Sequence, residues 1–229
     1  MTMEDVLRQI GKIGIVPVVR AASLEEANRA VEAICAGGIP VVEITMTVPN
    51  AIAVIREVLR QYGNQVLTGA GTVLTGERAE ECLDAGAEFV VSPGFSLPVL
   101  RAAKDRGKLC IPGALTPTEV MAVRSEGAEA VKIFPCGNVG GPKYIKALKA
   151  PFPEIKMIPT GGVNLSNATD YIAAGAFALG VGADLVDVAA IRNGNSRKIV
   201  DVARKLVEAV RQARQAGASE AKRPVPAAG

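Results

Sequence analysis

The sequence predicts an α/β fold, a single-domain (β/α)8 barrel of the TIM type with a short N-terminal helix. The 229 residues, 49% of them hydrophobic and 21% charged, suit one large soluble domain. Eight short apolar β runs alternate with helical stretches along the chain. A helix-ending glycine, a short spacer and a β run also recur at Gly38, Gly86, Gly127 and Gly175, at intervals of 48, 41 and 48 residues. An open doubly wound sheet is the second possibility.

The elements follow in a regular order. The β runs fall within 14–20, 36–45, 65–73, 85–93, 108–115, 126–135, 156–163 and 174–182. The helical stretches are expected over 23–36, 50–61, 76–85, 97–106, 117–125, 142–149, 166–174 and 196–215. Ser23 followed by Glu26 has the spacing of a capping box, and Thr116-Pro117 is a helix-start pair. We therefore expect one barrel over 1–216 and a disordered tail over 217–229, which is small, polar and proline-containing.

Composition argues against two classes of partner. A net charge of +3 and an aromatic content of 3% leave few contacts for phosphates or bases, so no nucleic acid is expected. No apolar run approaches the roughly 18 residues of a membrane span, and Glu4 and Asp5 stand where a signal peptide carries cations. We expect a cytoplasmic protein that does not bind membranes.

Cysteine and histidine usage narrows the chemistry. The four cysteines stand at wide, irregular spacing without a C-x-x-C pair, so they form neither a zinc signature nor a disulfide framework. The chain has no histidine, which removes Ser-His and Cys-His nucleophile pairs and imidazole ligands. Acid-base chemistry is left to Glu, Asp, Lys or Tyr.

Polar residues occur late in several of the apolar β runs. Lys132 lies in EAVKIFP, and with Lys132 taken as facing the interior, the period of two allows Arg20, Glu43, Thr72 and Thr160 to face it as well. The same period of two predicts that Ala70 faces inward together with Thr72. The alternatives stay open: a structural Glu43-Lys132 ion pair, a solvated rim position for Arg20, and threonine hydroxyls bonded to nearby backbone.

These residue types favour carbonyl chemistry. A lysine in apolar surroundings yields the neutral amine that forms a Schiff base with a carbonyl, and Glu43 is the candidate for moving protons. Gly161 and Gly162 follow one β run and Gly182 follows the last, so their backbone N–H groups are candidates for holding a phosphate. Two tight turns would give the same pattern.

Seven motifs together resemble the bacterial 2-keto-3-deoxy-6-phosphogluconate (KDPG) and 4-hydroxy-2-oxoglutarate (KHG) aldolases. They are EITMTVPNA, GAGTVL, VSPGF, PGALTPTE, VKIFP, GPKYIKALKAPFP and PTGGVN, in order within about residues 5 to 210. The resemblance implies a class I aldolase, a lyase of the Entner-Doudoroff pathway and carbohydrate metabolism, that forms a homotrimer and uses neither a metal nor a cofactor.

The resemblance also assigns roles. Lys132 would form the Schiff base and Glu43 would shuttle protons. The substrate-binding residues would be Arg20, Thr72, Pro93, Phe134, Thr160, Gly161, Gly162 and Gly182. Two positions depart from the pattern: Thr47 stands where some members carry an arginine, and Ala183 stands where a serine is frequent.

The implied reaction is cleavage of KDPG, a phosphorylated 2-keto acid, to pyruvate and D-glyceraldehyde 3-phosphate. Cleavage of KHG to pyruvate and glyoxylate is a possible second activity. The alternatives are a 2-dehydro-3-deoxy-6-phosphogalactonate aldolase, a phosphate-binding barrel isomerase or synthase, and a non-catalytic phosphate-binding barrel.

Overall fold

A computed structural model of the chain describes residues 1–220. The last helix, α10 (Arg197–Glu220), continues through Gly217 into the segment for which a tail was expected. The remainder of that expected tail, 221–229, lies outside the described residues. None of the helices within 1–220 is both long and apolar enough to cross a membrane.

The strands are parallel and almost wholly buried, which explains their near-continuous apolar sequences. They are β1 (Ile15–Val19), β2 (Val41–Thr45), β3 (Leu67–Gly71), β4 (Phe89–Val91), β5 (Leu109–Ile111), β6 (Gly113–Ala114), β7 (Ala130–Ile133), β8 (Lys156–Pro159) and β9 (Leu179–Val181). One sheet has the order β5-β4-β3-β2-β1-β9, and a smaller sheet has the order β6-β7-β8.

The two sheets together form a curled parallel sheet. Thr160, directly after β8, forms a parallel bridge with Gly180 of β9. At the other edge, β5 and β6 are consecutive in the chain and are separated by Pro112. Because proline has no N–H, it interrupts the ladder of the expected run 108–115, while its carbonyl still accepts a hydrogen bond from Lys132 N at 2.9 Å.

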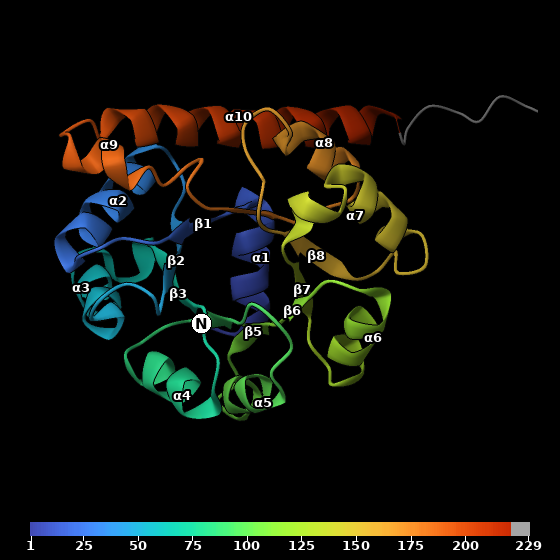
Figure 1. Cartoon of the computed structure of the whole chain (residues 1–229), viewed down its shortest axis with the longest axis horizontal. Coiled ribbons are helices and arrows are strands. Elements are labelled where there is room, and N and C mark those ends of the chain that lie inside the picture. Colours follow the sequence, from blue (N-terminus) through green and yellow to red (C-terminus); the bar gives the residue numbers. More distant parts are fainter. Residues whose placement is uncertain (221–229) are drawn as a thin grey trace, which may run out of the picture.

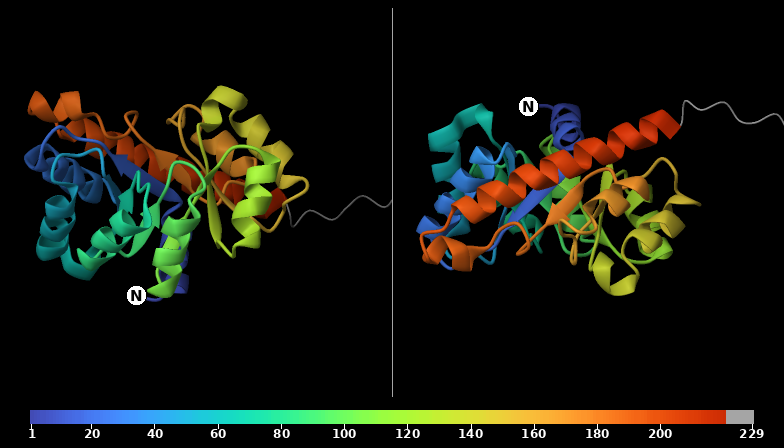
Figure 2. Two further views of the ribbon diagram at one scale, coloured as in Figure 1. Left: turned by 60° about the horizontal axis from the view of Figure 1, so that its bottom comes forward. Right: turned by 90° about the horizontal axis from the view of Figure 1, so that it is seen from above.

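Helices surround the strands (Figure 1). The helices other than α10 are α1 (Met3–Ile13), α2 (Leu24–Ala36), α3 (Ala51–Tyr62), α4 (Gly76–Asp84), α5 (Leu97–Asp105), α6 (Pro117–Ser125), α7 (Pro142–Lys149), α8 (Ala168–Ala173) and α9 (Val188–Arg192), with 3-10 turns η1 (Gly63–Gln65) and η2 (Cys136–Val139). The helix α10 runs along one side of the molecule and packs against α2 and α8 (Figure 2). The short N-terminal helix α1 buries Val6, Leu7 and Ile10.

The expected helix starts are formed by local hydrogen bonds. The Ser23 side chain accepts from Glu26 N at 3.1 Å, and the Glu26 carboxylate accepts from Ala22 N rather than from Ser23 N. At α6 the Thr116 side chain accepts from Glu119 N, and the Glu119 carboxylate accepts from Thr116 N at 2.9 Å. The start of α6 is therefore a full capping box. At the start of α2 the Glu26 carboxylate instead accepts from the backbone N–H of Ala22, one residue before Ser23.

The sheet register corrects one expectation about strand parity. Glu43 pairs with Gly69 and Thr45 with Gly71. A Cβ on Gly71 would overlap the Glu43 carboxylate, so Gly69 and Gly71 share the inner face with Glu43. Ala70 therefore faces the helices, not the interior as expected, because successive residues of a strand point to opposite faces.

Candidate active site

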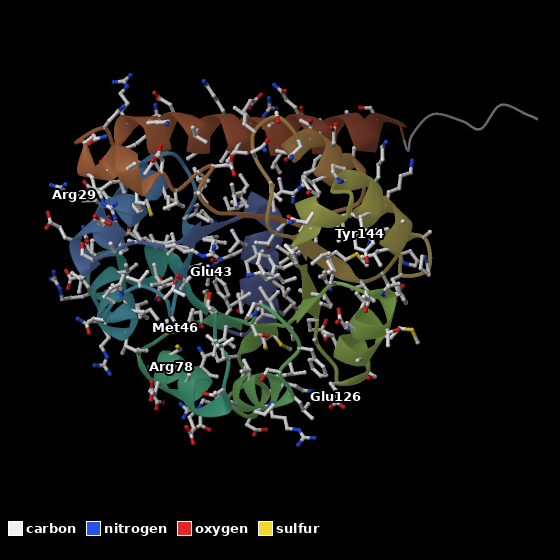
Figure 3. The ribbon with its side chains drawn as sticks, in the orientation of Figure 1. Arg29, Glu43, Met46, Arg78, Glu126 and Tyr144 are labelled. Carbon is white, nitrogen blue, oxygen red and sulfur yellow. The ribbon has the colours of Figure 1, made fainter. Side chains whose placement is uncertain are left out.

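Lys132 and Glu43 lie together inside the curled sheet. Lys132 is on β7 and Glu43 on β2, and each residue is only 3% exposed. Lys132 Nζ lies 3.8 Å from Glu43 Oε1, close enough for an ion pair but too far for a hydrogen bond. Figure 3 shows Glu43 among the central strands, whereas Arg29 lies on an outer helix. The two strands are far apart in sequence, so the pair exists only in the folded chain.

The electrostatics of Glu43 are set by its burial. Removal from water raises the pKa of the Glu43 carboxyl, and the charges of Lys132 and Arg20 lower it in part. Among the described residues, no group donates a hydrogen bond to Glu43 Oε1. A buried carboxylate without its hydrogen bonds is costly, so purely structural ion pairs normally satisfy them. Glu43 has a raised carboxyl pKa and an oxygen that accepts no hydrogen bond among the described residues, which suits a group that moves protons.

A small cavity of about 10 Å³ joins this pair to Thr160. Glu43, Lys132, Thr160 and Gly180 line it, together with Val16, Val91, Ile111 and Ile158. Thr160 is 5% exposed, and its hydroxyl donates to Ile158 O at 3.4 Å. The apolar side chains around three polar groups keep water away from the lysine.

Phe134 and Arg20 stand at the edge of this group. Lys132 Nζ lies 5.3 Å from the centroid of the Phe134 ring, within cation–π range. Arg20 directly follows β1 and is exposed, and its positive charge lowers the pKa of the Glu43 carboxyl. Arg20 makes no ion pair with another side chain among residues 1–220. Phe134 is half-buried.

The expected glycine loops also meet at this end of the strands. Gly161 and Gly162 have φ of 85° and 78°, in the left-handed region, and the Thr160–Gly180 bridge brings their loop beside the one that begins at Gly182. A Cβ on Gly161 would come to 3.4 Å from the Phe134 ring. Gly182 O accepts from the backbone N–H groups of two following residues. The loops therefore face the same end of the sheet as Phe134.

Two further expected residues flank the group without lining the cavity. Thr72 directly follows β3 and is half-buried. Its φ of 57° lies in the left-handed region, so the alternation of strand side chains does not extend to it as predicted. Pro93 follows β4, and a Cβ on Gly113 would overlap its carbonyl oxygen. Gly113 pairs with Lys132 in the sheet, so Pro93 lies one strand away from the lysine.

Three residues around the site were not among the predicted site residues. Thr45 is fully buried, and its hydroxyl donates to Val19 O at 3.0 Å and lies 2.7 Å from the Thr47 hydroxyl. Gly71 and Gly180 leave room for Glu43 and Thr160 respectively. The parity of β2 signals Thr45, because it lies two residues after Glu43. For the glycines the sequence offers no signal, since which side chain fills the space depends on the neighbouring strand.

A much larger hollow, about 1340 Å³, lies elsewhere, between α1, α8 and α10. Its charged residues, among them Arg8, Glu129 and Lys156, are all at least partly exposed. Catalytic groups depend on desolvation to shift their pKa values. The candidate active site is therefore the small cavity at Lys132, which is lined by buried ionisable groups, although the other hollow is larger.

The cysteines and acids point to no second reactive centre in the described part of the chain. Cys35, Cys82, Cys110 and Cys136 are free thiols. Burial raises the pKa of Cys82 and Cys110 to about 12, so these thiols stay protonated. Within residues 1–220, no three His, Cys, Asp or Glu side chains are grouped to hold a metal ion.

Comparison with known proteins finds aldolases among the relatives of this chain. The family model for KDPG and KHG aldolase matches residues 4–202. The KHG/KDPG aldolase of Escherichia coli K12 is 35% identical over 194 residues, 85% of this chain and 91% of the relative. The 2-dehydro-3-deoxy-6-phosphogalactonate aldolase of the same strain is 36% identical over 175 residues, 76% and 85% of the two chains.

A solved structure is also similar. It is the KDPG aldolase of Legionella pneumophila, described with pyruvate captured at low pH as a covalent carbinolamine intermediate. The TM-score is 0.82 at 32% sequence identity, over 88% of this chain and 97% of that one.

Proposed function

The chain belongs to the KDPG and KHG aldolase family, and we propose that it is a class I aldolase cleaving KDPG to pyruvate and D-glyceraldehyde 3-phosphate. Cleavage of KHG to pyruvate and glyoxylate is proposed as a second activity. The family membership bears out the resemblance drawn from the sequence motifs. The observation that carries the proposal is the buried Lys132–Glu43 pair, 3.8 Å apart, with a carboxylate oxygen that accepts no hydrogen bond among the described residues.

The reaction begins at Lys132. Its unprotonated Nζ attacks the C2 ketone, forming a carbinolamine, and loss of water gives the protonated imine. Glu43 passes the protons that the addition and the loss of water require, and burial, which raises the pKa of its carboxyl, favours the protonated form that can also donate.

The carbon–carbon bond breaks in the next step. Glu43, directly or through a water, takes the proton of the C4 hydroxyl while the C3–C4 electron pair moves into the imine. Glyceraldehyde 3-phosphate leaves, and the enamine of pyruvate remains on Lys132. A proton adds at C3, and hydrolysis of the imine then releases pyruvate and restores the lysine amine.

Substrate binding is divided between two sides of the site in this proposal. Thr72, Thr160 and Arg20 hold the carboxylate, and Phe134 and Pro93 line the site. The phosphate is held by backbone N–H groups of Gly161, Gly162 and Gly182. Gly161 and Gly162 have left-handed φ values, a conformation that aims successive N–H groups at an anion. Ala183 contributes no hydroxyl, so backbone donors carry that contact.

We also propose that the curled sheet is a closed (β/α)8 barrel. Counting β5 and β6 as one strand interrupted at Pro112 gives eight strands, the number expected from the sequence. The Thr160–Gly180 bridge supports closure at the opposite edge. Active residues at the C-terminal ends of the strands are then in the position that such barrels use.

A homotrimer is the proposed assembly. Leu74, Phe95 and Leu165 remain exposed on loops that follow the strands, which supports a contact surface for other subunits. Light scattering on the purified chain tests this: a mass of three chains is expected, and a mass of one chain would contradict it.

The decisive test of the chemistry is covalent trapping. Pyruvate and borohydride should add a reduced adduct to the peptide that contains Lys132, and Lys132→Met should take up none. Label on another lysine, with Lys132 unmodified, would refute the assignment. A non-catalytic binding barrel would leave the C3 protons of pyruvate unexchanged in heavy water.

The choice between epimers needs a separate measurement. The gluconate and galactonate aldolases of E. coli K12 are 35% and 36% identical to this chain, so similarity does not separate them. Initial rates on the two C4 epimers should favour the gluconate series, as the motif similarity at Thr45 and Thr160 suggests. Faster cleavage of the galactonate epimer would reverse that choice.

A further inference from the structure

Gly71 ends β3 directly beside the Glu43 carboxylate. A Cβ at Gly71 would overlap Oε1 of Glu43 and come within 2.5 Å of its Cδ and 2.6 Å of its Cγ. The three nearest atoms all belong to Glu43, so the space left by the missing side chain is filled by this one residue. The Glu43 carboxylate therefore packs directly against the backbone of Gly71.

The backbone itself does not require glycine at this position. Gly71 is in a regular strand, and its φ lies outside the left-handed region, unlike that of Thr72, which follows it. An alanine could adopt the backbone conformation of a strand residue without strain. What alanine could not do is leave the space that Glu43 occupies.

We propose that Gly71 is a positioning residue for Glu43: the missing side chain forms a slot that holds the carboxylate within reach of Lys132 Nζ. In the orientation that this slot permits, Glu43 Oε1 lies 3.8 Å from Lys132 Nζ. The inference rests on the proposed function, in which Glu43 moves protons at the substrate on Lys132. It adds a residue that acts through Glu43.

Gly71→Ala should separate the two roles of the site. We expect borohydride to trap pyruvate on Lys132 to the same final yield as in the unaltered chain at saturating pyruvate. Exchange of the pyruvate C3 protons with heavy water should fall at least tenfold, because loss of one proton-transfer group costs about 10²- to 10⁴-fold and a displaced group keeps part of that contribution. The adduct yield reports the lysine, and the exchange rate reports the glutamate.

The pH profile adds a readout that general damage to the fold would not move. Burial is the larger influence on the Glu43 pKa, and it outweighs the opposing charges of Lys132 and Arg20. A carboxylate displaced toward solvent regains a lower pKa, so the acid limb of the exchange profile should move to lower pH in Gly71→Ala. An exchange rate within twofold of the unaltered chain, with a superimposable acid limb, would overturn the proposal.

A second variant covers the case in which Gly71→Ala does not fold. Glu43→Ala removes the three atoms that lie nearest to the new Cβ, so the double variant Glu43→Ala/Gly71→Ala should fold and unfold at the urea midpoint of Glu43→Ala alone. Failure of the double variant to fold would overturn the proposal. The matched control is Gly69→Ala, whose Cβ would overlap the Phe89 ring. This substitution should lower the urea midpoint by the same amount whether position 43 is Glu or Ala.

The two proposals fail differently. If the unaltered chain neither traps pyruvate nor exchanges its C3 protons, the proposed function is wrong. If the unaltered chain does both and Gly71→Ala does so equally fast, only the slot is wrong.

Discussion

Replacing Lys132 with methionine should make the stability of the protein depend strongly on pH. The substitution removes the cation nearest to Glu43 and leaves the carboxyl buried, with only the exposed Arg20 to lower its pKa. At 3.8 Å, the attraction between Nζ and Oε1 is about 4 kcal/mol for an effective dielectric constant of about 20. That figure is of the size measured when one partner of a buried pair is removed.

The sign follows from the direction of the pKa shift. The Glu43 pKa is already raised above its ordinary value of 4.5, so its contribution favours the folded state below that pH and is lost as pH rises through the folded-state pKa. Lys132→Met raises this pKa further. The variant should therefore match the unaltered chain most closely near pH 4.5 and lose up to about 4 kcal/mol relative to it by pH 8.

Urea unfolding at a series of pH values measures this loss. The control is Lys132→Met/Glu43→Gln, which has no titrating group at position 43 and should not show the additional fall in the free energy of unfolding above pH 4.5. If the single and double variants lose stability in parallel as pH rises, the buried carboxyl is not responsible and the reasoning is refuted.

Three further predictions concern the site. Glu43→Gln should slow pyruvate C3 proton exchange by about 10²- to 10⁴-fold while leaving Lys132 open to borohydride trapping, and exchange at the original rate would remove Glu43 from the mechanism. Arg20→Gln should shift the acid limb of the exchange profile to higher pH, because the Arg20 charge lowers the Glu43 pKa; an unmoved limb would contradict that coupling. Thr160→Val, similar in shape, should raise KM for the keto acid about tenfold with little change in the urea midpoint, since the hydroxyl makes only a long bond of 3.4 Å to Ile158 O. A large loss of stability with an unchanged KM would instead make Thr160 structural.

Much of the fold could be read from local patterns. Pro117–Ser125 and Pro142–Lys149 form helices at the bounds expected from the sequence, because proline fixes the first turn and Thr116 caps one of them. The run 108–115 was expected as one strand, and Pro112 divides it in two. The helix at Val188–Arg192 was not expected, since its five residues are too few to show a periodic pattern.

The candidate site divides in the same way. The sequence by itself determined that Lys132 lies in an apolar strand and that, without histidine, a carboxylate such as Glu43 is left for proton transfer. Only the tertiary structure decided that these two residues lie 3.8 Å apart, that Ala70 faces outward, and that Gly71 leaves the space that Glu43 fills. The physical reason is that strand alternation is local, whereas register and side-chain space depend on neighbouring strands that are distant in the chain.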